Sequence, residues 1–146
     1  MNSTYLAIIE DDLVVQESLV EFMGMQPNIE VVIVSNSVES FFELLKNSNK
    51  LPNILLLDVN LPGLSGLEGL PLIKKELPEI DVMMLTTFDE TDKIFQALSC
   101  GACSYMSKRI SLQKILEAIE RNNVLLINED SLEKNIRRKR MDPGNK

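Results

Sequence analysis

Short apolar runs alternate along the chain with longer stretches in which apolar residues recur every three or four positions. In the clearest run, residues 54–57 are all apolar and lead directly into Asp58, and residues 61–63, Leu-Pro-Gly, follow. A continuous apolar run bounded by turn-forming residues is typical of a strand buried on both faces of a parallel sheet. We therefore expect Asp58 at the carboxyl end of a central strand.

Four more apolar runs predict strands, and periodic stretches after each run predict helices. Asp12 and Ser37 are the expected N-caps of the first two helices. Pro71 must lie in the first turn of the third helix or kink it, because proline has no amide hydrogen to donate. The strands are expected at 5–9, 30–34, 54–58, 81–85 and 103–106, and the helices at 13–24, 38–45, about 70–77, about 89–98 and from 112 onward.

Five strands that alternate with helices, without an internal repeat, favour an α/β fold with a parallel sheet and helices on both faces. All strands of such a sheet point the same way, so their carboxyl ends share one edge. Right-handed crossovers restrict the topology further. Polar residues that end different strands are therefore expected to converge at that edge, and these are Glu10, Asp11, Asp58, Thr86 and Lys108.

Three carboxylates at one point repel each other unless a divalent cation lies among them. Oxygen ligands without a nearby His or Cys favour Mg²⁺ or a similar hard ion, and the chain contains no His at all. A lysine and a hydroxyl suit the phosphoryl oxygens that a metal leaves free, which is the role expected for Lys108 and Thr86. The set predicts a phosphoryl site with Asp58 as the in-line nucleophile. The alternative is that each acid is only a solvated loop residue or a helix cap.

Charge is spread unevenly over the 146 residues, whose net charge is −7. Residues 137–146 hold five Lys/Arg and one Asp, which gives +4 and leaves −11 for the remainder. An acidic body argues against direct binding of nucleic acid. No apolar run approaches the roughly 18 residues of a membrane span, and no signal peptide is recognised. With two cysteines only, we expect a reducing cytoplasm.

Two further motifs have plain structural interpretations. Cys100 and Cys103 have the spacing of a thiol redox motif, but they follow the end of a helix, so core packing is favoured. The basic residues 137–140 are interpreted as a solvated tail or linker, with weak and salt-sensitive binding of nucleic acid as the alternative.

Over about residues 4–121 the sequence resembles a bacterial response-regulator receiver domain. The family has an acidic pair after the first strand, an Asp after the third, Thr or Ser after the fourth and Lys after the fifth. The stretch 56–66 resembles the family's phosphoacceptor segment, and 85–89 resembles the subclass linked to LuxR-type helix-turn-helix outputs. The resemblance implies a flavodoxin-like fold with strand order 2-1-3-4-5.

The resemblance also implies a role for each matching residue. Asp58 would accept a phosphoryl group from a sensor histidine kinase or a phosphotransfer protein. Mg²⁺ would be bound by Asp11, Asp58 and the backbone carbonyl of Asn60, with Glu10 acting mostly through water. Lys108 would pair with Asp58 and then with the phosphoryl group, while Thr86 and Tyr105 would move on activation. Ordinary strand packing is the alternative for Tyr105.

Residues 122–146 are expected to be a tail or linker, too short for an output domain. The chain is then either a complete single-domain regulator or a fragment of a DNA-binding regulator, which the subclass favours. DNA would be bound only through an output domain that this chain lacks, and dimers would form through the fourth helix, fifth strand and fifth helix. The other functional hypotheses are a haloacid-dehalogenase-like Mg²⁺-dependent phosphatase and a degenerate receiver that only binds partners. The phosphatase class has a second Asp two positions after its nucleophile, where this chain has Asn60.

Overall fold

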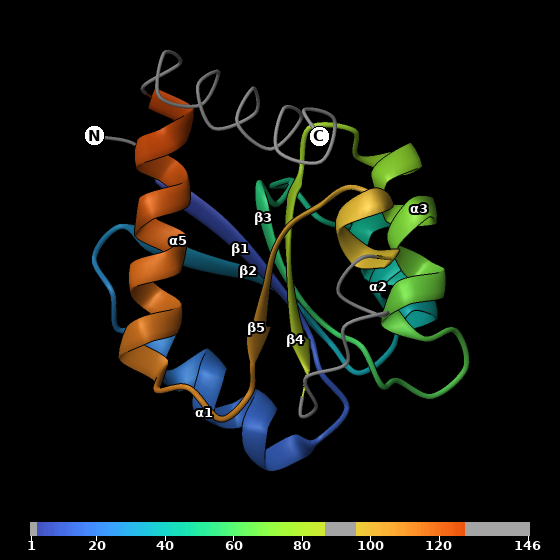
Figure 1. Cartoon of the computed structure of the whole chain (residues 1–146), viewed down its shortest axis with the longest axis horizontal. Helices are drawn as coiled ribbons and strands as arrows, with labels where there is room; N and C mark the ends of the chain where they lie inside the picture. The colour runs from blue at the N-terminus through green and yellow to red at the C-terminus, as the bar shows by residue number, and fades with distance from the viewer. Residues whose placement is uncertain (1–2, 87–95, 128–146) are drawn as a thin grey trace, which may run out of the picture. The chain divides into compact units, whose positions relative to one another are not determined.

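Strands and helices alternate along the chain in the computed structural model, which describes residues 3–86 and 96–127 except the side chains of 122–127 (Figure 1). The chain divides into two compact units, 1–112 with the whole sheet and 113–146 with nearly all of the last helix. The elements are β1 (Thr4–Ile9), α1 (Leu13–Gly24), β2 (Ile29–Ser35), α2 (Val38–Lys46), β3 (Ile54–Asp58), α3 (Gly66–Glu76), β4 (Asp81–Thr86), β5 (Ala102–Ser107) and α5 (Leu112–Ile127).

The five strands form one parallel sheet in the order β2-β1-β3-β4-β5, which confirms the predicted fold class and strand order. Asp58, the last residue of β3, pairs in register with Leu85 of β4. Thr86 at the end of β4 pairs with Ser107 at the end of β5. The carboxyl ends of the central strands therefore lie together, as the alternation of strands and helices predicted.

Both faces of the central strand are buried, since all five residues of β3 are inaccessible to solvent. Figure 1 shows α1 on one face of the sheet and α2 and α3 on the other. The face toward α2 and α3 carries an apolar core. From the strands it includes Ala7, Ile9, Leu55, Leu57, Val82 and Met84, and from the helices Val38, Phe41, Leu67, Leu70 and Ile73.

Side-chain caps begin the first two helices at the predicted residues. The Asp12 carboxylate accepts hydrogen bonds from the amides of Val14 and Val15, at 3.0 and 3.3 Å. The Ser37 hydroxyl accepts one from the amide of Ser40, at 3.0 Å. Each cap satisfies donors that the first turn of a helix leaves without a partner.

The third helix begins earlier than the apolar pattern predicted. Ser65 and Glu68 form a capping box, in which each side chain accepts a hydrogen bond from the other's backbone amide. The helix therefore starts at Gly66, and Pro71 lies in its interior. Of the two predicted alternatives for Pro71, the first turn is therefore excluded, because the polar capping pair and not the apolar spacing determines where α3 starts.

The other helical predictions are only partly open to comparison. The expected start of the fourth helix, near residue 89, lies outside the described residues, while 96–99 are helical and Gly101 follows with a φ of 109°. The last helix begins at Leu112, as predicted, and continues to Ile127, with Ile115, Leu116 and Ile119 buried. Within the described residues no helix has the length and apolar character needed to cross a membrane.

Close packing between α3 and β3 fixes the segment that follows Asp58. A methyl group at Gly66 would lie 2.0 Å from the backbone oxygen of Asp58, and one at Gly69 would lie 2.6 Å from a methyl group of Val38. The amide of Gly66 also donates to the carbonyl of Val59 at 2.8 Å. The start of α3 therefore depends on glycine at position 66.

Replacing Gly66 with alanine should destabilise the protein, because the backbone of Asp58 would have to move. We expect a loss of about 1–3 kcal/mol or more in the free energy of unfolding, measured by urea denaturation. Gly24→Ala is the matched control, since nothing lies within 4 Å of a methyl group there and alanine favours a helix. Equal stability of the two variants would contradict the close packing of α3 against β3.

Candidate functional site

The carboxyl edge of the sheet brings together residues that are far apart in the sequence. Glu10 follows β1, Asp58 ends β3, Thr86 ends β4 and Lys108 follows β5. The first three are almost fully buried, with exposed fractions of 0 %, 1 % and 2 %. Acidic side chains are seldom buried to this extent without a charged partner.

Lys108 is the partner that the two buried acids share. Its Nζ lies 2.7 Å from Glu10 Oε1 and 3.0 Å from Asp58 Oδ2. Both oxygens are buried, and beyond these ion pairs neither has a hydrogen-bond donor in the described part of the chain. One ammonium group therefore faces two carboxylates, and Glu10 Oε1 and Asp58 Oδ2 could each accept a further interaction.

The environment changes how these groups titrate. Burial, followed by the negative charge of Glu10, raises the pKa of Asp58 from 3.8 to about 7, although Lys108 and the Asn60 amide act in the opposite direction. Burial disfavours the charged form of Lys108, but the two carboxylates outweigh it and raise the pKa of this lysine above its ordinary value. Lys108 is therefore charged at neutral pH, and Asp58 would hold its negative charge more readily beside another cation.

The acidic cluster that could bind a metal ion consists of Glu10, Asp11 and Asp58. Each offers a carboxylate oxygen, and these oxygens lie within 4.8 Å of one another. Glu10 Oε2 accepts from the amide of Asp12 at 2.9 Å, and Asp58 Oδ1 accepts from the amide of Asn60 at 3.3 Å. Asp11 is exposed, so the cluster has one open side. The oxygens without further donors, Glu10 Oε1 and Asp58 Oδ2, suit a hard divalent cation.

Three other residues were predicted for this site. The carbonyl of Thr86 accepts a hydrogen bond from the amide of Lys108 at 2.7 Å, which ties the ends of β4 and β5 together. Asn60 is exposed and lies two residues after Asp58. Tyr105 is half-buried against the apolar core, and its hydroxyl is buried without a hydrogen-bond partner among the described residues. Their proposed roles in metal binding and switching stay predictions.

Two residues that the sequence analysis did not select also make contacts close to the site. The Gln16 side-chain amide donates to the carbonyls of Glu10, at 2.8 Å, and Ser35, at 3.4 Å, and so joins the ends of β1 and β2. Glu39 accepts from the amide of Leu64 at 3.0 Å, in the loop that follows Asp58. Neither has a sequence signal of its own, because both lie on helices where polar residues are common.

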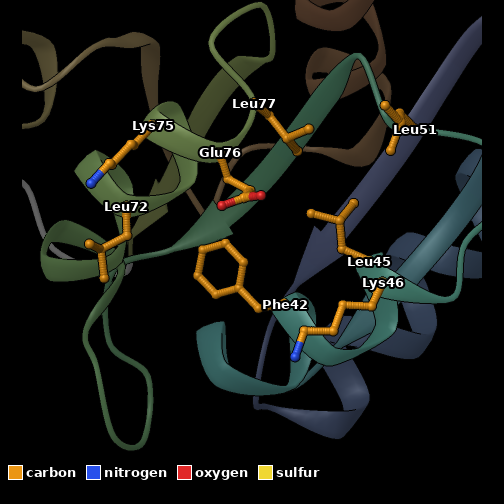
Figure 2. Close-up of a pocket in the computed structure, with 8 residues that line it drawn as sticks. All are labelled: Phe42, Leu45, Lys46, Leu51, Leu72, Lys75, Glu76 and Leu77. Carbon is orange, nitrogen blue, oxygen red and sulfur yellow. The ribbon is translucent and has the colours of Figure 1, made fainter.

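An apolar groove of about 680 Å³ lies elsewhere in the same unit, between the last turns of α2 and α3 (Figure 2). Phe42 and four leucines line it, and Lys46, Lys75 and Glu76 are its charged residues. With one carboxylate it lacks the ligands for a divalent cation. Cys100 packs against the apolar core, as predicted, and no disulfide bond joins Cys100 and Cys103. The acidic cluster is therefore the candidate site.

The family model of the response regulator receiver domain matches residues 6–120. The chain belongs to this family. It is 32% identical to the transcriptional regulatory protein LnrK of Bacillus subtilis (strain 168) over 114 residues, which are 78% of this chain and 51% of LnrK. It is 31% identical to the response regulator protein VraR of Staphylococcus aureus over 116 residues, 79% of this chain and 54% of VraR. The chain thus spans about half the length of these curated relatives.

Solved structures agree with the family. A LuxR-family DNA-binding response regulator from Staphylococcus aureus has a TM-score of 0.73 at 27% identity, over 81% of this chain and 97% of that one. A CheY-like receiver domain protein from Methanospirillum hungatei JF-1 has a TM-score of 0.76 at 22% identity, over 88% and 99% of the two chains, and this likeness concerns the fold alone. The resemblance to receivers of the LuxR type is therefore confirmed.

Stability should depend on pH through Asp58. The pKa of Asp58 is about 7 in the folded protein, above its ordinary value of 3.8. Between these two pH values the folded state therefore keeps a proton that the unfolded chain has lost. The wild type should therefore lose stability relative to Asp58→Asn as the pH rises from about 4 to about 7, by roughly 1–4 kcal/mol. Urea unfolding of both proteins across this range, without divalent cations, measures the difference. A difference that does not change with pH would contradict the raised pKa.

Proposed function

We propose that this receiver domain is a phosphoacceptor switch of two-component signal transduction, with Asp58 as the acceptor. The observation that carries the proposal is the buried Glu10–Lys108–Asp58 arrangement beside the exposed Asp11, at the carboxyl edge of the sheet. The donor would be a phosphohistidine of a sensor histidine kinase or of a phosphotransfer protein. Family membership supports the assignment, because the predicted residues match the family's pattern one by one.

In the proposed transfer, a carboxylate oxygen of Asp58 forms a bond to phosphorus while the phosphorus–nitrogen bond of the phosphohistidine breaks. The electron pair of that bond stays on the imidazole. Lys108 would move from pairing with Asp58 to pairing with the phosphoryl oxygens, and the Thr86 hydroxyl would donate to one of them. The position of Lys108 supports this role, because its Nζ already lies 3.0 Å from Asp58 Oδ2.

Mg²⁺ is the cofactor that fits the cluster best, with Asp11, Asp58 and the Asn60 carbonyl as its ligands and Glu10 acting through water. When bound it would neutralise charge on the phosphoryl oxygens. An all-oxygen set with one exposed acid favours a hard cation that keeps part of its water.

Phosphorylation would then act as a switch. It adds about −1.5 to −2 charges and new acceptor oxygens beside residues that are already buried. Thr86 and Lys108 would follow those oxygens, and Tyr105, whose hydroxyl has no hydrogen-bond partner within the described residues, would change its packing. The result is a shift between conformations that exist beforehand. The domain would catalyse its own phosphorylation and dephosphorylation slowly and would not be a turnover enzyme.

The output is proposed from the relatives and the subclass. The relatives include transcriptional regulators, and a LuxR-family neighbour is described as DNA-binding. Control of transcription in the cytoplasm is therefore the proposed outcome, with DNA bound through a separate output domain. Dimers would form through the face of the fourth helix, β5 and α5. The haloacid-dehalogenase-like phosphatase is disfavoured because Asn60 stands where that class has an acid.

Incubating the protein with acetyl phosphate and Mg²⁺ should add about 80 Da, the mass of one phosphoryl group, to the wild type. The adduct should be absent from Asp58→Asn, which lacks the acceptor, and from wild type treated first with a chelator. Intact-mass spectrometry is the measurement. Asp12→Asn is the matched control, since Asp12 caps α1 with its side chain and is not in the acidic cluster.

Two outcomes would contradict the proposal. An adduct of the same mass on Asp58→Asn would place the acceptor elsewhere. Release of free phosphate over many turnovers, without a lasting adduct, would favour the phosphatase.

A further inference from the structure

The loop between β3 and α3 carries the backbone carbonyl that the proposed function assigns to the cation. The loop is fixed at both ends. At its start, the amide of Val59 donates to the carbonyl of Leu85 at 3.0 Å, and at its end Ser65 forms the capping box of α3. Between these ends the chain turns at Gly63, whose φ is 72°.

The middle of the loop is tied to α2 by one carboxylate. Glu39 Oε2 accepts from the amide of Leu64 at 3.0 Å, across 25 positions of sequence. Among the hydrogen bonds of the described residues, it is the one that joins residues 61–64 to another element. Leu61 and Leu64 pack against the apolar core, which sets how deep the loop lies but does not orient its amides.

Glu39 is held so that its carboxylate faces the loop. It lies in the first turn of α2, which Ser37 caps, and its neighbours Val38 and Phe41 are fully buried. The Leu64 amide and its own backbone amide lower the pKa of Glu39, so the carboxylate is ionised at neutral pH. A methyl group at Gly63 would lie 2.6 Å from Glu39 Oε2, which shows how closely the loop approaches this oxygen.

We propose that Glu39 is a positioning residue for the metal site: through the Leu64 amide, it holds the loop that presents the Asn60 carbonyl to the cation. Glu39 need not touch the cation or the phosphoryl group, and it acts by limiting where the loop can lie. This inference rests on the proposed function, because that function assigns the Asn60 carbonyl to Mg²⁺. No short sequence motif marks the pair, since its two members lie on different elements.

Replacing Glu39 with alanine should weaken Mg²⁺ binding by roughly three- to tenfold, the effect of losing one hydrogen bond that orders a ligand. Isothermal titration calorimetry with MgCl₂ measures the affinity directly and does not require phosphorylation. Glu39→Gln should stay within about twofold of the wild type, because its side-chain carbonyl can still accept from Leu64. With acetyl phosphate, the Mg²⁺ concentration for half-maximal phosphorylation should rise in Glu39→Ala, while the rate at saturating Mg²⁺ stays close to that of the wild type.

Glu43→Ala is the matched control on the same helix. Glu43 is exposed and pairs with Lys46 at 3.4 Å, so its loss should leave Mg²⁺ affinity unchanged. Wild-type affinity in Glu39→Ala, or an equal loss in Glu43→Ala, would overturn the positioning role. If the wild type binds Mg²⁺ but gains no phosphoryl group from acetyl phosphate, the proposed function is overturned and the positioning role of Glu39 is not. If the wild type binds no Mg²⁺, both proposals are overturned.

A double-mutant cycle with Gly63→Ala tests the contact itself. Alanine at position 63 should weaken Mg²⁺ binding in the wild-type background, because it meets Glu39 Oε2 and needs a positive φ. In the Glu39→Ala background the same change should cost less, since the clash is gone and only the backbone strain is left. Additive effects would overturn a direct contact between Glu39 and the loop.

Discussion

The ion pairs of Lys108 with Glu10 and Asp58 lie where water hardly reaches, and this burial constrains the whole site. A buried carboxylate loses several kcal/mol of hydration, and one lysine compensates two of them only in part. The cost is visible in Asp58, whose pKa is raised to about 7. A second cation beside these oxygens would relieve the same cost. The arrangement is therefore costly for the fold alone, and this cost is what the proposed metal ion would reduce.

The sheet imposes this burial on Asp58. The whole of β3 is inaccessible to solvent, because β1 and β4 pair with its edges and helices cover its faces. A residue at the end of such a strand stays buried unless the loop after it opens. Here the loop is held down by the close approach of Gly66 to the Asp58 carbonyl and by the capping box of α3. Fold and site are thus coupled, since the features that stop β3 also keep its carboxylate away from water.

Much of the fold, and the convergence of Glu10, Asp58 and Lys108 at one edge of the sheet, followed from the sequence for physical reasons. The apolar run before Asp58 is typical of a buried strand, and parallel strands bring Glu10, Thr86 and Lys108 to the same edge. The start of α3 was missed because Ser65 and Glu68 determine it, while the apolar pattern around Pro71 is weak. Glu39 and Gln16 were missed because each makes its hydrogen bond to a different element, and the sequence alone does not show which elements lie close together.

The central claim is that the buried carboxylates form a site for a divalent cation, and the change in folding stability on adding Mg²⁺ tests it most directly. A cation that binds only the folded state should raise the free energy of unfolding, by about 1.4 kcal/mol at roughly ten times its dissociation constant. We predict this gain for the wild type over a sodium chloride control of equal ionic strength, and its loss in Asp11→Asn, which removes the exposed ligand. No gain in the wild type, or the same gain in Asp11→Asn, would contradict a metal site at this edge of the sheet.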